Sequence, residues 1–248
     1  MYPVSNAFLE AIESNTRKYY WTGTITTVNG VRYPFENKDI VKGSGYITRQ
    51  CCGSTEIELG TVYAAELGIS LFSDIDRYTL EGAEVKLYFH LYLADGTVES
   101  IPMGVFEVSE ANRNIKTLEL KAYDYMLRFD KALSLNATSG TAFNYLAAAC
   151  SACKVELAQT QAQIEALPNG KETLGVYAEN DMETYRDLLF YVGQVLGCVC
   201  LINREGKLQL VPYSDTVVMT IPQKGRYTSS YSDFVTRYTA VSSTNQLR

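Results

Sequence analysis

The chain has 248 residues, of which 46% are hydrophobic and 20% are charged. This composition is typical of a globular protein and excludes a disordered one, and the length suits one large domain or two ordinary ones. The 22 basic and 28 acidic residues give a net charge of −6, so the chain is a poor candidate for binding nucleic acid.

The lengths of the apolar segments indicate in which compartment the protein is made. The N-terminus lacks the basic start and apolar core of a signal peptide. The longest uncharged apolar stretch, residues 188–203, is shorter than the roughly 20 residues that a membrane span needs. We therefore expect a protein made in the cytoplasm, with no membrane contact in this segment.

The first 35 residues predict a short helix followed by a hairpin. Ser5 can cap the helix, which is expected over residues 4–14. Strand-forming residues from 18 to 35 are divided by Asn29-Gly30, a strong signal for a tight turn. Three further segments have strand character, the last of them also fitting a helical turn: residues 46–52, 55–59 and 61–72.

Residues 84–93 alternate without interruption between two faces. A period of two predicts a strand with one buried face, and Asp95-Gly96 predicts a tight turn after it. The return strand contains Pro102, which has no N–H for the ladder, so we expect this strand to be broken there or to lie at an edge. A second turn at residues 112–114 and a strand over 115–123 complete a β-meander. Its expected core residues are Val85, Leu87, Phe89, Leu91, Leu118, Leu120 and Ala122.

The second half of the chain has a different pattern. After a polar linker over residues 134–140, a helix is expected over 141–153, and another from near Asp181 to Gly197. A hairpin follows over residues 198–211. The apolar stripe of the first helix should contain Phe143, Leu146, Ala147 and Cys150.

These elements predict a β-rich α+β protein. About six to eight short strands precede residue 130, which favours a tube-like β-barrel or sandwich domain over residues 1–131. A small α+β domain is expected over 132–220. Residues 221–248 include the strand-like run 227–241, which we interpret as the first strand or strands of an incomplete second barrel, or as a return to the first.

Six cysteines occur in three close pairs: Cys51 with Cys52, Cys150 with Cys153, and Cys198 with Cys200. The last four could supply a zinc site, but they lie in apolar periodic positions, where cysteine behaves as a small buried hydrophobe. Without a secretion signal, structural disulfides are not expected. We predict no metal, no cofactor and no disulfide required for the fold.

Other polar groups also lack a catalytic pattern. His90 is the only histidine; it lies on the outward side of its strand, and no Gly-x-Ser-x-Gly elbow exists for it to serve. Gly43-Ser44-Gly45 is not followed by the lysine and helix of a phosphate loop. Glycoside hydrolysis uses paired carboxylates, but the carboxylates available for it are as numerous as in any acidic chain: Asp74, Asp76, Glu107, Glu110, Asp181 and Glu183. The sequence predicts no catalytic residue and no enzyme.

Four passages resemble the N-terminal region of phage tail hub proteins. These are the tail-tip proteins of siphophages and Gram-positive prophages, related in fold to the baseplate hub of contractile phages. The most specific piece is Leu-Lys-Ala-Tyr-Asp at residues 120–124, which closes the meander after Pro-x-Gly-x-Phe at 102–106. The resemblance is one of pattern and contains no catalytic signature. The four passages are residues 45–52, 58–69, 82–108 and 118–127.

The resemblance implies a structural protein of the virion tail, a hub adaptor that joins the tail tube to the tip or baseplate and lines the channel. Such hubs carry two tube-like barrels per chain, and three chains match a hexameric tube. A second barrel would begin near Arg226 and continue beyond residue 248, so the full-length chain would be a homotrimer. Its partners would be tube, distal tail, tip or fibre proteins, and DNA would pass without specific binding.

Two other functions stay open. The 19 tyrosines suit a carbohydrate- or receptor-binding β-module of a tail, because their rings can stack on sugars. The chain could also be part of a tail-associated cell-wall hydrolase.

Overall fold

The computed structural model describes residues 2–53, 58–135, 138–176, 182–214, 216 and 220. Contacts divide the chain into two compact units, Met1–Tyr213 and Ser214–Arg248. The described helices and strands all lie in the first unit, and none of these helices is long and apolar enough to span a membrane. The predicted strand at 227–241 and the helix start at Asp181 lie outside the described residues, and the domain boundaries at 131 and 220 stay predictions.

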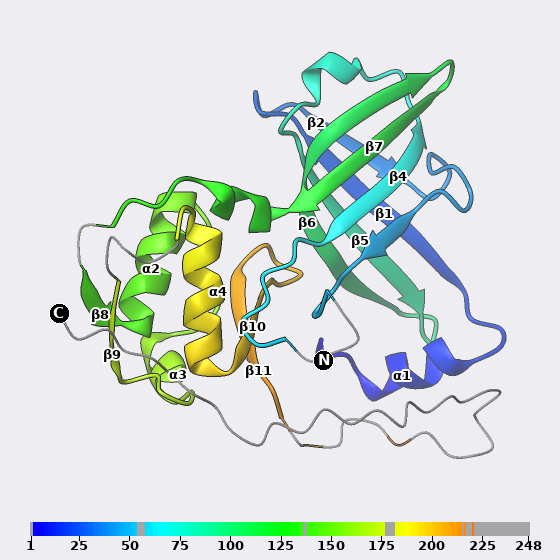
Figure 1. Ribbon diagram of the computed structural model, residues 1–248. Coiled ribbons are helices and arrows are strands. Elements are labelled where there is room, and N and C mark those ends of the chain that lie inside the picture. The colour runs from blue at the N-terminus through cyan, green and yellow to red at the C-terminus, as the bar shows by residue number, and fades with distance from the viewer. Residues whose placement is uncertain are drawn as a thin grey trace, which may run out of the picture. The chain divides into compact units, whose positions relative to one another are not determined.

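A seven-stranded antiparallel sheet occupies the first half of the chain (Figure 1). Its strand order is β2-β1-β5-β6-β7-β4-β3, with β2 and β3 as the outermost strands. Residues 39–41, directly after β2, hydrogen-bond to β4: the Val41 N–H donates to the Ser70 carbonyl at 2.9 Å and the Phe72 N–H to the Asp39 carbonyl at 2.7 Å, so backbone hydrogen bonds link the β2 side of the sheet to β4. Beyond β2 the chain crosses to β4, where Ile40 forms an isolated bridge with Leu71. The strands are β1 (Tyr19–Thr26), β2 (Arg32–Glu36), β3 (Tyr46–Thr48), β4 (Glu66–Phe72), β5 (Glu84–Tyr92), β6 (Val98–Asn114) and β7 (Thr117–Asp124).

The inner face of the sheet is the one that the alternation predicts. Its buried side chains include Val85, Leu87, Leu91, Leu118, Leu120 and Ala122. Phe89 is a partial exception, because it is only half-buried, with its ring against those of Phe8, Tyr19 and Trp21. Phe8 comes from α1 (Asn6–Glu13), which Ser5 caps as expected, its hydroxyl accepting a hydrogen bond from the Phe8 N–H at 3.0 Å.

The prediction for Pro102 is wrong, because β6 is unbroken and is the central strand of the sheet. Leu87 pairs with Gly104 and Tyr88 with Pro102, so Met103 is left over as a β-bulge. A bulge is the one interior place where a strand tolerates proline, and Gly104 adopts φ +151° there.

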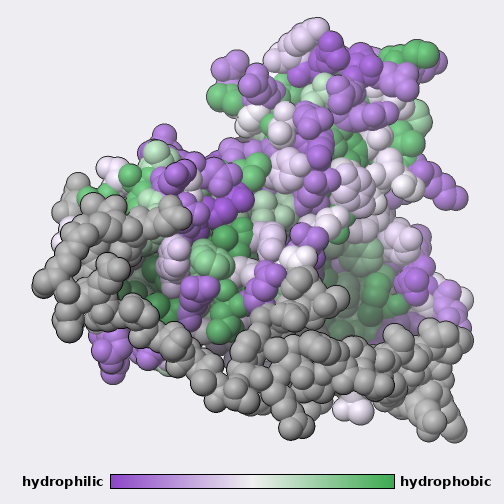
Figure 2. Space-filling model, viewed as in Figure 1, coloured by the Kyte–Doolittle hydropathy of each residue, from purple (hydrophilic) through white to green (hydrophobic). Residues whose placement is uncertain are grey.

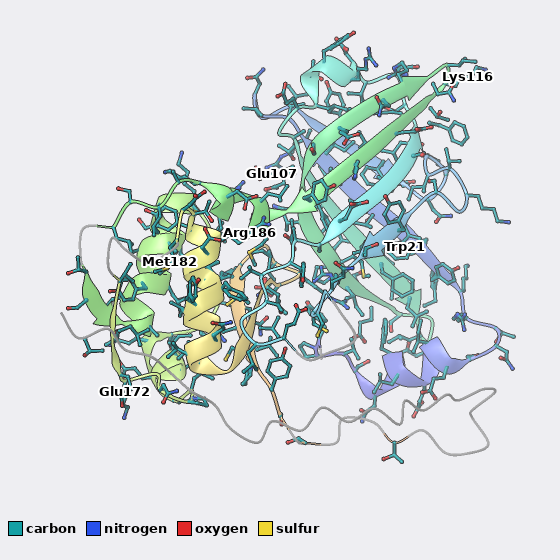
Figure 3. All side chains as sticks on the ribbon, in the orientation of Figure 1. Trp21, Glu107, Lys116, Glu172, Met182 and Arg186 are labelled. Atoms are coloured by element: carbon teal, nitrogen blue, oxygen red, sulfur yellow. The ribbon has the colours of Figure 1, made fainter. Side chains whose placement is uncertain are left out.

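The predicted turn at residues 112–114 is also misplaced. These residues belong to β6 and pair with β7, and the turn lies at Ile115-Lys116, with Ile115 at φ 50°. The two asparagines therefore mark the end of a long strand rather than its turn. Lys116 lies at the tip of this hairpin, at the end of the sheet remote from α2 and α4 (Figure 3).

Each sheet edge carries an aromatic ring folded across a glycine of the neighbouring strand. Gly23 in β1 pairs with Phe35 in β2, and a Cβ atom at Gly23 would lie 2.2 Å from the Phe35 ring. Gly68 in β4 pairs with Tyr46 in β3, where the corresponding distance to the Tyr46 ring is also 2.2 Å. The absent side chains leave room for each ring to lie across the neighbouring strand.

The remaining elements form a small α+β assembly beside one end of the sheet (Figure 1). The helices of this assembly are capped by threonines, Thr141, Thr160 and Thr184, each within a capping box. Its elements are η2 (Tyr125–Asp130), β8 (Ser139–Thr141), α2 (Ala142–Cys153), α3 (Gln161–Glu165), β9 (Thr173–Gly175), α4 (Tyr185–Leu196), β10 (Cys198–Ile202) and β11 (Leu208–Pro212). A further short 3-10 segment, η1 (Arg77–Thr79), lies between β4 and β5 of the sheet.

The second helix and the hairpin follow the prediction closely. The stripe from Tyr185 to Leu196 is buried, and Gly197 ends α4 in the left-handed conformation at φ 62°. The buried face of α2 differs, because Phe143 and Ala147 are only half-buried. Most of α2 is apolar, so its periodicity did not single out one face. Its buried residues are Ala142, Tyr145, Leu146, Ala149, Cys150 and Cys153. The fold class is therefore the β-rich α+β one expected from the sequence.

Candidate functional site

The sheet and the α+β assembly are interleaved in the chain. We call residues 2–53 and 65–124 the sheet part, and residues 58–64 and 125–213 the α+β part. The Gly60 N–H donates to the Cys198 carbonyl at 3.0 Å, and the Cys200 N–H donates to the Thr61 carbonyl at 3.0 Å. The chain therefore leaves the sheet after β3, runs along β10, and returns as β4.

The β6 bulge is the point where two arginines connect the parts. Arg49, just after β3, donates to the Met103 carbonyl at 3.0 Å and to the Ile202 carbonyl at 3.5 Å. Arg204, in the β10–β11 turn, donates to the Pro102 carbonyl at 3.4 Å. A bulge disrupts the ladder and leaves backbone groups available, and these side chains use them to tie the hairpin to the sheet.

Gly206 allows the same hairpin turn to approach the sheet closely. Its φ of +83° favours glycine. A Cβ atom there would lie 3.0 Å from the Tyr125 ring and 3.3 Å from Val105. A side chain at this position would therefore push the turn away from β6.

Asp124 ends β7 and starts η2 at the centre of the junction. Its buried carboxylate accepts hydrogen bonds from the Ala65 and Met126 N–H groups, both at 3.0 Å. Burial raises the pKa of Asp124 to about 6, although these bonds and nearby Arg49 oppose the shift. The carboxylate thus links the residue that precedes β4, Ala65, to the end of β7.

A second charged group lies on the outer face beside the junction. Glu84 and Glu107 are direct cross-strand partners, an arrangement that is unfavourable for like charges unless they are compensated. Arg128 compensates Glu107 through two hydrogen bonds of 2.8 and 2.9 Å, and its guanidinium lies 3.7 Å from the centre of the Tyr125 ring. The Tyr125 hydroxyl donates to Glu84.

The ionisation of these groups suits an ion-pair network rather than acid–base chemistry. Burial tends to raise the pKa of Glu84, but the hydrogen bonds from Tyr125 and Lys86 outweigh it, so the pKa is lowered. The hydrogen bond to Glu107 raises the pKa of Arg128. Glu107 and Arg186 both lie at the junction (Figure 3). The Arg186 Nε atom lies 2.8 Å from the Asp130 carboxylate without its N–H being aimed at the oxygen.

The other candidate carboxylates have separate positions. Asp76 caps η1 by accepting from the Tyr78 N–H at 3.1 Å, and Asp74 lies in the loop before it. Glu110 is exposed in β6, and Glu183 lies just before α4. Among the described residues, no group of three or more histidine, cysteine, aspartate or glutamate side chains is placed to hold a metal.

His90 faces outward, as expected, and both of its ring nitrogens are engaged. Nε2 lies 2.7 Å from the Thr22 hydroxyl and Nδ1 lies 2.6 Å from the Ser100 hydroxyl. The imidazole stacks on Tyr20 with centroids 4.5 Å apart and on Tyr88 at 6.4 Å. Burial lowers the pKa of His90. This aromatic row stiffens the outer face of β1 and β5 and leaves neither nitrogen free.

The three cysteine pairs differ in their surroundings. Cys150, Cys153, Cys198 and Cys200 are buried in the α+β core, as their apolar positions predict. Burial raises the pKa of Cys150 and of Cys200 to about 12, so these thiols are unreactive. Cys51 is exposed and Cys52 half-exposed, in the loop after β3.

A hollow of 740 Å³ opens between β1 and the segment that leads into β3. Trp21, Leu67, Leu87 and Met103 contribute apolar walls, and Gly43-Ser44-Gly45, the segment considered as a phosphate loop, lies along its rim. Trp21 extends from β1 (Figure 3), and a recessed hydrophobic area is visible beside the more hydrophilic upper sheet (Figure 2). The rim segment therefore lines an apolar space.

Neither the protein-family models nor the curated proteins include a match to this chain. Solved structures do align with it. The 43 kDa tail protein of prophage MuSo2 from Shewanella oneidensis has a TM-score of 0.48 at 10% identity, covering 81% of this chain and 57% of that one. A chain of the half-lidded Francisella PdpA–VgrG complex has a TM-score of 0.51 at 11% identity, covering 82% and 33%.

A chain of a gene transfer agent virion also aligns, with a TM-score of 0.34 at 8% identity, covering 55% of this chain and 57% of that one. This chain therefore spans at most 57% of the length of these three proteins. At such low identity the likeness is one of fold, and the Francisella match, at 0.51, shows a shared fold over most of the chain.

Sequence reasoning missed the residues that build the junction: Arg49, Thr61, Asp124, Arg204 and Gly206. Each acts through partners far away along the chain, which periodicity does not reveal. The available signal was the Pro102–Gly104 pair inside an otherwise regular strand, which indicates a bulge and hence a place for side chains from elsewhere to bind.

Proposed function

We propose that this chain is a structural component of a bacteriophage or prophage tail tip, a hub adaptor that joins the tail tube to the tip or baseplate and lines its channel. Its location is the virion tail, and its partners are the tube or distal tail protein and the tip or fibre proteins. It carries no catalytic site of its own. The full-length chain acts as a homotrimer.

The observation that carries this proposal is the position of the residues that resemble tail hub proteins. Pro-x-Gly-x-Phe, residues 102–106, forms the β6 bulge that Arg49 and Arg204 bind. Leu-Lys-Ala-Tyr-Asp, residues 120–124, ends in the carboxylate at the centre of the junction. The resembling passages thus build the connection between the parts, which is the feature a load-transmitting adaptor needs.

Two further properties support the same role. The fold shared with a chain of the Francisella PdpA–VgrG complex extends over 82% of this chain. The net charge of −6 suits a conduit, because an acidic surface repels the DNA backbone and does not hold it.

Deleting the reading frame from a prophage that encodes it tests this role. We expect induced particles to lack complete tails, with tube and tip unconnected in electron micrographs, and plasmid-borne wild-type chain to restore them. An Arg49→Ala, Arg204→Ala double variant should restore them poorly, whereas Arg32→Ala, at an exposed site in β2, should act as wild type. Complete tails in the deletion strain would contradict the proposal.

The oligomeric state is tested separately by light scattering. We expect the protein made from the natural reading frame to be a trimer. A monomeric full-length protein that still builds tails would overturn the trimer while leaving the adaptor role in place.

The aromatic row around His90 gives a carbohydrate-binding module some support as a second candidate. Tyr88 is 36% exposed, and tyrosine rings stack on sugars. If this were the function, the deletion strain would build complete tails that fail to adsorb to cells, and Tyr88→Ala would reproduce the adsorption defect.

A further inference from the structure

Cys51 and Cys52 differ from the other cysteines in being accessible. Each of the four cysteines of the α+β core is at most 5% exposed. The Cys52 thiol donates to the Cys51 sulfur across 3.8 Å, and both thiols are free. Two neighbouring thiols that face each other at the surface form a dithiol, a group with its own exchange chemistry.

Polar contacts hold the backbone of residues 51–53, which carry this dithiol. The Thr61 hydroxyl donates to the Cys51 carbonyl at 2.7 Å, and the Gly53 N–H donates to the Glu58 carboxylate at 3.3 Å. A Cβ atom at Gly53 would lie 2.1 Å from the Tyr63 hydroxyl. A larger residue than glycine at position 53 would therefore clash with Tyr63, and polar contacts hold the backbone on both sides of Cys52.

The same loop lies between two ties of the junction. Arg49, which precedes the dithiol, binds Met103 and Ile202. Thr61 is buried; its hydroxyl holds the Cys51 carbonyl, and its own carbonyl accepts from the Cys200 N–H. A change in the conformation of the Cys51–Cys52 peptide therefore affects the hydrogen bonds of Thr61, which join the sheet part to the α+β part.

We propose that Cys51 and Cys52 form a thiol–disulfide exchange site for low-molecular-weight disulfides, and that its oxidation releases the Thr61 tie. The Cys51 thiolate attacks one sulfur of the small disulfide, forms a mixed disulfide and expels one thiolate. The Cys52 thiolate then attacks the Cys51 sulfur, closes the vicinal disulfide and expels the second thiolate. The dithiol loses two electrons, the small disulfide gains them, and the two thiol protons pass to the two expelled thiolates.

The geometry of neighbouring residues makes this vicinal disulfide labile. Adjacent Cα atoms are about 3.8 Å apart, whereas disulfides usually join Cα atoms about 4.4–6.8 Å apart, and departures from this range make the bond more reducible. The small ring contains the Cys51–Cys52 peptide, so closing it rotates the Cys51 carbonyl. That carbonyl is the acceptor of the Thr61 hydroxyl, so ring closure breaks this hydrogen bond.

The first step should be faster in alkaline solution. The hydrogen bond with Cys52 and the closeness of the second sulfur raise the pKa of Cys51. Only the thiolate attacks a disulfide, so the rate should rise with pH into the alkaline range.

Intact-mass analysis of the folded chain with oxidised glutathione tests the exchange. We expect wild type to lose the mass of two hydrogens and to keep no glutathione. Cys52→Ser, which lacks the resolving thiol, should retain one glutathione, and Cys198→Ser should behave as wild type. Stable glutathione adducts on wild type, or reaction only in denaturant, would overturn the exchange site.

Thermal unfolding of the reduced and oxidised forms tests the link to Thr61. We expect a lower midpoint for the oxidised form, no such difference in Thr61→Val, and the difference restored in Thr61→Ser, which keeps the hydroxyl. Thr48→Val, on the exposed face of β3, is the matched control and should keep the difference. A difference that persists in Thr61→Val would show that oxidation acts elsewhere.

Discussion

Replacing Gly23 with alanine should destabilise the sheet strongly, although alanine ordinarily suits a strand better than glycine by roughly 0.5–1 kcal/mol. The added Cβ atom would lie 2.2 Å from the Phe35 ring and 2.7 Å from the Lys86 carbonyl oxygen. Phe35 is buried, at 5% exposed, and the Lys86 carbonyl belongs to β5, which lies between β1 and β6. Neither neighbour can therefore move without a loss of stability. Overpacking costs about 1–3 kcal/mol, and we expect a net loss of about 2 kcal/mol.

Two other glycines serve as matched comparisons. The three heavy atoms nearest to a Cβ atom at Gly68 all belong to the Tyr46 side chain, which is 49% exposed and can swing away. The main loss would be the 2.7 Å hydrogen bond from Tyr46 to Glu66, about 1 kcal/mol. At Gly45 no heavy atom of the described residues lies within 4 Å, so alanine should be neutral there.

Urea unfolding followed by circular dichroism, and by the fluorescence of Trp21, measures these differences. The reasoning is refuted if Gly23→Ala is as stable as Gly45→Ala. A double-mutant cycle adds a second check. Phe35→Ala alone should cost about 3–5 kcal/mol but clearly less in the Gly23→Ala background, and additive losses would mean that the ring does not lie across the glycine.

Three further predictions concern charge and packing. Burial raises the pKa of Asp124 from 3.8 to about 6, so its contribution to stability is present below pH 3.8 and is lost as the pH rises through 6. Wild type should lose about 2 kcal/mol relative to Asp124→Asn between pH 4 and 7, and a flat difference in urea titrations would refute the shift. Phe106→Ala should cost about 3–5 kcal/mol in the same assay because Phe106 is fully buried, whereas Phe89→Ala, at a half-buried site, should cost clearly less; equal losses would contradict the packing. Arg128→Lys should cost about 1 kcal/mol because lysine cannot make the two-point contact. Arg32→Lys, at an exposed site in β2, is the neutral control.

The sequence predicted well wherever structure follows from a local repeat. The alternation from Glu84 to Tyr92 identified the inner face of β5, and the apolar stripe of α4 with Gly197 identified that helix and its end. It failed at Pro102, because a missing N–H is equally compatible with an edge and with a bulge, and the distinction depends on the strands on either side.

The junction was beyond sequence reasoning for a related reason. Asp124 and Arg49 are polar residues at the ends of strands, which usually indicates solvent exposure. Their partners, Ala65 for the first and Met103 and Ile202 for the second, come together only after the chain has folded. No spacing along the sequence encodes such a meeting.

The interleaved path of the chain has a mechanical consequence. The backbone passes from the sheet part to the α+β part after Arg49, returns at Ala65, and passes over again at Asp124. A single covalent connection would act as a swivel, whereas these successive passages resist both twisting and bending. A pulling force applied to one part is therefore shared among several backbone segments in parallel. The two parts should then move together as one rigid body under load, and separate only when backbone hydrogen bonds between β-strands break.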